Sequence, residues 1–84
     1  MTKIQNITVL GSTGTIGMNT LDVVARHAGR FRVVALTANR QVERLFEQCR
    51  QFQPDYAVML DPDCAEVLRG RIRLAGLDVE VLSG

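Results

Sequence analysis

Residues 7–17 read Ile7-Thr8-Val9-Leu10-Gly11-Ser12-Thr13-Gly14-Thr15-Ile16-Gly17, a short apolar run followed at once by three glycines spaced as GxxGxxG. Beyond Gly17, apolar side chains recur with the spacing of a helix. A strand that ends in a glycine-rich turn before a helix leaves backbone N–H groups free, and these favour the diphosphate of a dinucleotide. The segment therefore predicts a strand–turn–helix unit that binds phosphate. The alternative is a tight turn that binds nothing.

Composition and charge exclude several classes of partner. The chain has 84 residues, 46% of them hydrophobic, and a formal net charge of +1. A charge so close to zero gives no positive surface for nucleic acid or an anionic membrane. No apolar run approaches the ~20 residues that span a bilayer. The first predicted strand begins too close to Met1 for a targeting segment, so we expect a cytoplasmic protein. From the net charge and the apolar runs we expect neither a nucleic-acid nor a membrane partner.

Strand and helix patterns alternate along the chain. Strands are predicted at 7–10, 31–36, 56–60 and 79–82, and helices at about 15–27, 42–52 and 62–75. This alternation predicts an α/β fold with a doubly wound parallel sheet, a Rossmann-type NADP-binding domain truncated after about four strands. Because the complete architecture has about six strands, we expect residues 1–84 to be the N-terminal part of that domain. Its catalytic and C-terminal domains would then lie outside this chain.

The turn itself supplies the first candidate binding residues. Free N–H groups from Thr13 through Ile16 are expected to donate to phosphate oxygens at the positive end of the helix. Hydroxyl groups of Ser12, Thr13 and Thr15 are expected to add further donors. Gly17 is expected to let the helix pack closely whether or not a ligand binds.

A second candidate group follows the second predicted strand, where the chain reads Thr37-Ala38-Asn39-Arg40-Gln41. NAD-preferring domains place an acidic residue here to bind the ribose 2′-hydroxyl, and this segment has none. The guanidinium of Arg40 instead suits the 2′-phosphate of NADP. Asn39 can cap the next helix, and either Asn39 or Gln41 could reach ribose or phosphate. The alternative for Arg40 is a solvated side chain without a ligand.

The two cysteines are not predicted to carry chemistry. Cys49 lies on an apolar helical face and is expected to be a buried thiol. Cys64 lies near a predicted helix start, where a thiolate would be somewhat stabilised. Neither forms a metal-ligand cluster with His27.

Several of these segments resemble one enzyme family. The segments are Leu10–Gly17, Thr20–Val24, Phe31–Leu36, Ala38–Arg40 and Glu80–Gly84. Together they resemble the N-terminus of the 1-deoxy-D-xylulose 5-phosphate reductoisomerases, over essentially the whole chain. The resemblance implies the NADPH-binding part of an enzyme of non-mevalonate isoprenoid synthesis. That enzyme rearranges its sugar-phosphate substrate and reduces the resulting aldehyde, using NADPH and a divalent metal (Mg or Mn), as a homodimer.

The resemblance also implies which residues contact the cofactor. Carried over by position, the contacts fall on Thr13, Gly14, Thr15, Ile16, Asn39, Arg40 and Gln41. Thr15 stands where Ser is frequent in the family, and Gln41 where Asn is usual. The catalytic residues, metal-binding carboxylates and substrate phosphate site of the family would lie beyond Gly84, so none is assigned in this chain.

Two other functions fit the same residues. The chain could belong to another NADP-dependent reductase with a GxxGxxG turn, such as a semialdehyde dehydrogenase or an extended short-chain dehydrogenase. It could also be a non-catalytic module that senses dinucleotides, because binding and catalysis occupy separate regions of such proteins. Turnover of deoxyxylulose phosphate with NADPH would distinguish these possibilities.

Overall fold

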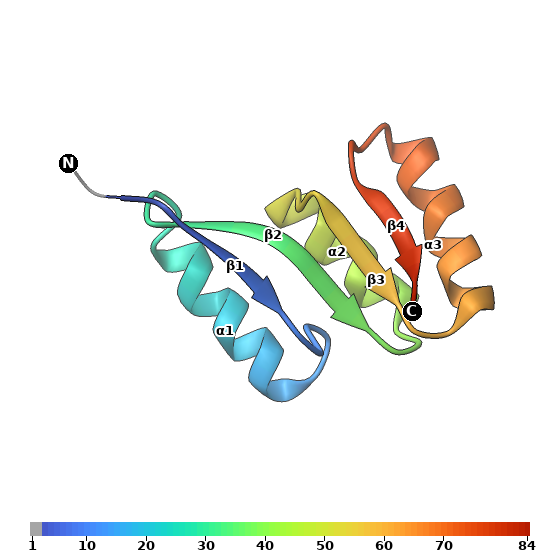
Figure 1. Cartoon of the computed structure of the whole chain (residues 1–84), viewed down its shortest axis with the longest axis horizontal. Helices are drawn as coiled ribbons and strands as arrows, with labels where there is room; N and C mark the ends of the chain where they lie inside the picture. The colour runs from blue at the N-terminus through green and yellow to red at the C-terminus, as the bar shows by residue number, and fades with distance from the viewer. Residues whose placement is uncertain (1–2) are drawn as a thin grey trace.

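A computed structural model describes residues 3–84 and contains four strands and three helices in strict alternation. The strands are β1 (Gln5–Val9), β2 (Phe31–Ala38), β3 (Tyr56–Met59) and β4 (Glu80–Ser83). The helices are α1 (Thr15–Arg26), α2 (Val42–Phe52) and α3 (Pro62–Ala75). The strands pair in parallel in the order β1-β2-β3-β4 (Figure 1). The predicted α/β fold with a parallel sheet is therefore confirmed.

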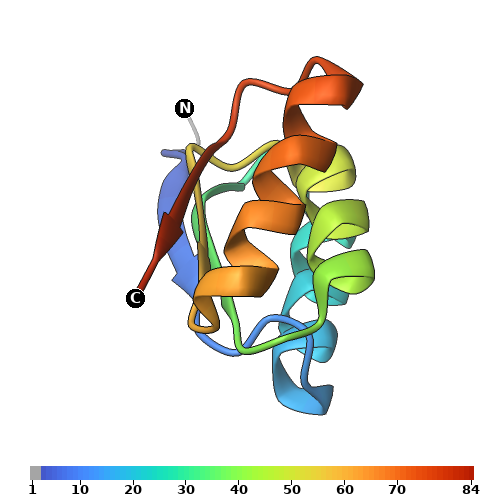
Figure 2. The same cartoon turned by 90° about the vertical axis from the view of Figure 1, so that its right-hand side faces the viewer.

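All three helices lie on one face of the sheet (Figure 2). Crossovers between parallel strands are right-handed as a rule, and each new strand is added on the same side of the previous one. Successive helices therefore return to the same face. The helices that a doubly wound sheet carries on its second face are not among residues 3–84. That face presents apolar side chains such as Tyr56 and Leu82, which are 40% and 41% exposed.

The core lies between the sheet and this single helical layer. It takes inward-facing residues from all four strands and all three helices, with Leu36, Leu45, Met59 and Leu68 among its largest fully buried side chains. None of the helices in residues 3–84 is long and apolar enough to cross a membrane.

Local sequence signals explain the helix ends. Asp61 caps α3, because its Oδ1 accepts hydrogen bonds from the N–H groups of Asp63 (2.9 Å) and Cys64 (3.1 Å). Gly76 ends the same helix in a left-handed conformation. Asn39, which the sequence offers as a possible cap of α2, does not cap it: the cap position is Gln41, and no side chain caps this helix. The chain makes a further turn after Asn39 before helical geometry begins.

Candidate functional site

The loops that follow β1, β2 and β3 all lie at one edge of the sheet, because the strands are parallel (Figure 1). The glycine-rich turn joins β1 to α1, residues 39–41 join β2 to α2, and Leu60 and Asp61 join β3 to α3. The two groups of residues predicted to bind a cofactor are thus brought to the same edge. In parallel α/β sheets this carboxyl edge is where ligands bind.

Hydrogen bonds to β2 fix the glycine-rich turn. The N–H of Gly11 donates to Oγ1 of Thr37 at 2.9 Å, and the N–H of Ser12 donates to the Thr37 carbonyl at 2.8 Å. Gly11 has a φ of +62°, a left-handed conformation that glycine adopts without strain. The chain therefore reverses here in a fixed position relative to the end of β2.

Gly17 lets α1 pack directly against this turn. A Cβ at Gly17 would lie 2.6 Å from Cα of Ser12 and would also collide with the Gly11 carbonyl oxygen. No side chain larger than hydrogen fits at this close approach. The predicted packing role of Gly17 is confirmed.

The start of α1 presents unpaired donors. Gly14 is the cap residue, no side chain caps the helix, and its first turn contains no acidic residue. Within residues 3–84 the N–H groups of Thr13, Thr15 and Ile16 have no acceptor. The N–H of Gly14, in contrast, donates to the Gly11 carbonyl at 3.0 Å. The prediction of a free N–H at every position from 13 to 16 is therefore wrong at Gly14, because the turn closes on itself there.

Ser12 does not face this donor group. It is fully buried, and its hydroxyl donates to Oε1 of Gln48 on α2 at 2.7 Å. The expectation that the Ser12 hydroxyl would add a phosphate donor is therefore wrong. Thr13 is half-buried and Thr15 is exposed.

Arg40 lies at the same edge, with its side chain 76% exposed. Its Nε is 3.4 Å from Oδ2 of Asp61, so the guanidinium is paired with the residue that caps α3. The backbone supports this arrangement, since the N–H of Asp61 donates to the Asn39 carbonyl at 3.2 Å. Arg40 is thus held near the end of β3, and it keeps most of its surface open to a ligand.

The carboxylate of Asp61 is held in its charged form. The N–H of Cys64 lowers the pKa of this group most, and the N–H of Asp63 and the charge of Arg40 lower it further. Asp61 therefore carries a full negative charge beside Arg40 near neutral pH.

Sequence reasoning missed Gln48 and the pairing of Asp61 with Arg40. The sequence does place Gln48 on the inward stripe of α2, beside Leu45 and Cys49. A polar side chain on an inward stripe needs a hydrogen-bond partner. The sequence does not reveal which partner that is, since Ser12 is 36 residues away.

The cysteines have no part in this site. Burial raises the pKa of Cys49 to about 12, in agreement with the predicted buried thiol. The expectation of a stabilised thiolate at Cys64 is wrong, because partial burial and then the negative charge of Asp61 raise the pKa of its thiol. Within residues 3–84 no group of three or more His, Cys, Asp or Glu side chains could hold a metal ion.

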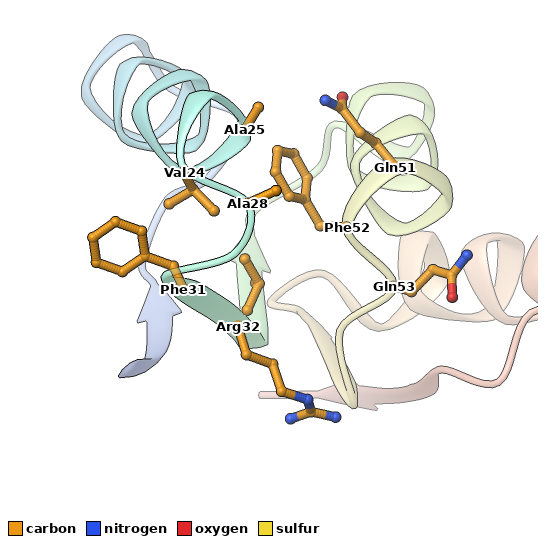
Figure 3. Close-up of a pocket in the computed structure, with 9 residues that line it drawn as sticks. Val24, Ala25, Ala28, Phe31, Arg32, Gln51, Phe52 and Gln53 are labelled. Carbon is orange, nitrogen blue, oxygen red and sulfur yellow. The ribbon is translucent and has the colours of Figure 1, made fainter. Parts of the chain in front are cut away.

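One hollow in the described part of the chain lies away from these residues. It has a volume of about 510 Å³ and opens between the C-terminal ends of α1 and α2 (Figure 3). Val24, Phe31 and Phe52 line it, and they lie toward the opposite edge of the sheet from the glycine-rich turn. This hollow brings together none of the predicted site residues.

Comparisons with known proteins find relatives that match nearly the whole chain. A sequence profile described as 1-deoxy-D-xylulose 5-phosphate reductoisomerase matches residues 7–84. A protein of that name from Nitrosomonas europaea is 66% identical over the whole chain, and one from Nitrosospira multiformis is 61% identical. The chain spans 20% and 21% of the length of these two relatives.

Solved structures show the same fold. One is a DOX-P reductoisomerase in complex with NADPH, fosmidomycin and magnesium, which matches 96% of the chain with a TM-score of 0.92 and 36% identity. Another is the reductoisomerase of Zymomonas mobilis in complex with NADPH, which matches 98% of the chain with a TM-score of 0.90 and 39% identity. The chain covers 20% and 21% of those structures. Because the profile match spans residues 7–84, this chain belongs to the 1-deoxy-D-xylulose 5-phosphate reductoisomerase family.

Proposed function

We propose that these 84 residues form the NADPH-binding part of a reductoisomerase that converts 1-deoxy-D-xylulose 5-phosphate to 2-C-methyl-D-erythritol 4-phosphate in non-mevalonate isoprenoid biosynthesis. The observation that carries the proposal is the uncapped start of α1. There, the N–H groups of Thr13, Thr15 and Ile16 have no acceptor within residues 3–84. Structures of relatives with the same fold are complexes with NADPH, which supports the choice of cofactor.

The diphosphate of NADPH would lie over the start of α1. The helix contributes roughly half a positive charge at this end, and Gly14 keeps the approach clear of a side chain. The hydroxyls of Thr13 and Thr15 would add donors on the same side.

The adenosine end would extend toward residues 39–41. Arg40 would bind the 2′-phosphate with its exposed guanidinium, and Asn39 and Gln41 would offer amide groups to ribose or phosphate. A charge-assisted hydrogen bond of this kind contributes ~1.5–3 kcal/mol. This contact would select NADPH over NADH, because NADH has no phosphate there.

The remaining functions of the enzyme would belong to residues outside this chain. When bound, NADPH supplies a hydride, and the residues described here hold its diphosphate and adenosine end. The divalent metal, Mg or Mn, would be held elsewhere, since residues 3–84 offer no cluster of ligands for it. On this proposal, residues 1–84 are the N-terminal part of a Rossmann domain, and further domains bind the sugar phosphate.

Two further points belong to the proposal. We propose that the full-length protein is a homodimer and that it works in the cytoplasm. Light scattering of the purified full-length protein and fractionation of cells that produce it would test these two points.

The deciding experiment uses the full-length protein that carries these 84 residues. We expect it to bind NADPH, and to oxidise NADPH only when 1-deoxy-D-xylulose 5-phosphate and a divalent metal are both present. Binding without turnover would favour a dinucleotide-sensing module. Failure to bind either NADPH or NADP would overturn the proposal.

A further inference from the structure

Ser12 is the one buried polar side chain in the described part of the chain, and it lies in the middle of the glycine-rich turn. Its N–H donates to the Thr37 carbonyl at 2.8 Å. Its hydroxyl donates to Oε1 of Gln48 at 2.7 Å, and its carbonyl accepts from Nε2 of Gln48 at 2.8 Å. Every polar group of Ser12 is therefore used inside the protein, two of them by Gln48.

These two hydrogen bonds determine how the amide of Gln48 is oriented. The Ser12 carbonyl can only accept, so it requires the NH₂ group of Gln48 opposite it. The amide oxygen then faces the Ser12 hydroxyl, which must act as the donor. Because a single side chain holds both groups, the Ser12 carbonyl cannot turn away without breaking the contact.

The peptide bond between Ser12 and Thr13 carries this constraint to the cofactor side. A trans peptide is planar, so its C=O and N–H groups point in opposite directions. Gln48 draws the Ser12 carbonyl toward α2, and the Thr13 N–H consequently points away from α2. This N–H is one of the donors that have no acceptor within residues 3–84.

We propose that Gln48 is a positioning residue for the diphosphate site, which fixes the Ser12–Thr13 peptide so that the Thr13 N–H faces the cofactor. This inference rests on the proposed function, because it concerns how the same site is built. Without Gln48 the peptide is free to rotate. Rotation would turn a carbonyl oxygen toward the phosphates and would replace attraction with repulsion.

The test is a set of variants in the full-length protein, with dissociation constants measured by fluorescence titration. Gln48→Met keeps the side-chain length but loses both hydrogen bonds, and we expect the Kd for NADPH to rise about tenfold, the low end for loss of one charged hydrogen bond. Gln51→Met is the matched control: Gln51 is exposed on the same helix, and we expect no change. Gln48→Glu is a second variant that keeps the acceptor for the Ser12 hydroxyl but cannot donate to the carbonyl when ionised, and it should also weaken binding.

Adenosine 2′-monophosphate separates positioning from a general structural role. It has the 2′-phosphate but no diphosphate, so its Kd should be the same in the Gln48 variants and in the wild type. Parallel loss of affinity for both ligands would mean that the variants disturb the whole site, and it would overturn the inference. A wild-type Kd for NADPH in both folded Gln48 variants would also overturn it. If the wild-type protein binds no NADPH, the proposed function itself fails, and the inference fails with it.

Discussion

Arg40 and Asp61 form an ion pair across the carboxyl edge of the sheet, with Nε of Arg40 3.4 Å from Oδ2 of Asp61. The two residues belong to different loops, after β2 and after β3. The arginine side chain is 76% exposed and the aspartate 25%. A 2′-phosphate that approaches Arg40 would therefore meet a guanidinium that already has an anionic neighbour.

Arg40→Glu should remove the preference for NADPH. The substitution exchanges the cation for an anion that repels the 2′-phosphate and can accept a hydrogen bond from a ribose 2′-hydroxyl. We expect the ratio of kcat/KM for NADPH to that for NADH to fall at least tenfold in the full-length enzyme. Arg26→Glu, at the far end of α1, is the control and should leave the ratio unchanged. An unchanged ratio in Arg40→Glu would exclude this role for Arg40.

Asp61→Asn should tighten the binding of NADPH. Asparagine is as good a helix cap as aspartate, so α3 should keep its start while the charge beside Arg40 disappears. One repulsive charge fewer near the 2′-phosphate should lower the Kd for NADPH by about two- to fivefold. The gain should shrink as salt is added and be absent for NADH. Weaker binding of NADPH would show instead that Asp61 holds Arg40 in its binding position.

Much of the backbone could be predicted because its signals are local. The apolar stripe of α2 predicts both ends of that helix correctly. The capping signals Asp61-Pro62 and Gly76 do the same for α3. β1 was less predictable: it begins at Gln5 and ends at Val9, because it pairs with β2 from Gln5 onward although its first residues are polar. Strand ends depend on the neighbouring strand, which a periodic pattern does not contain.

Interactions between distant residues account for the parts of the site that could not be predicted. The glycine spacing indicated the turn, but the burial of Ser12 depends on where α2 places Gln48. Arg71 shows the same limitation on another surface. It pairs with Glu43, and its guanidinium carbon lies 4.6 Å from the centre of the Phe46 ring, so it links α3 to α2.

Acid should destabilise the fold as the carboxylates of Asp55 and Asp61 are protonated. The two guanidinium hydrogen bonds from Arg32 to Asp55, at 2.6 Å and 3.0 Å, lower the pKa of that carboxyl. Because this pKa is lowered, the charged carboxylate stabilises the folded state at pH values above its ordinary pKa of 3.8. This contribution is lost as the pH falls through the lowered pKa.

The measurement is the melting temperature of the full-length protein between pH 6 and pH 2. Asp55→Asn removes one of these titrating groups, so its melting temperature should start lower at pH 6 and fall less steeply below about pH 4. An identical slope in the variant and the wild type would show that Asp55 does not contribute to acid unfolding.

Gly17→Ala should destabilise the protein and loosen the cofactor site together. Its methyl group would lie 2.6 Å from Cα of Ser12, and backbone there cannot move without breaking the hydrogen bonds to Thr37. Overpacking of this kind costs ~1–3 kcal/mol, and we expect a weaker affinity for NADPH because the turn must shift. Gly70→Ala is the matched control in α3, where a Cβ meets nothing within 4 Å. It should stabilise the helix by up to ~1 kcal/mol. Urea unfolding measures the stability of both variants, and titration with NADPH measures their affinity. Equal stability of Gly17→Ala and the wild type would contradict the close approach of α1 to the turn.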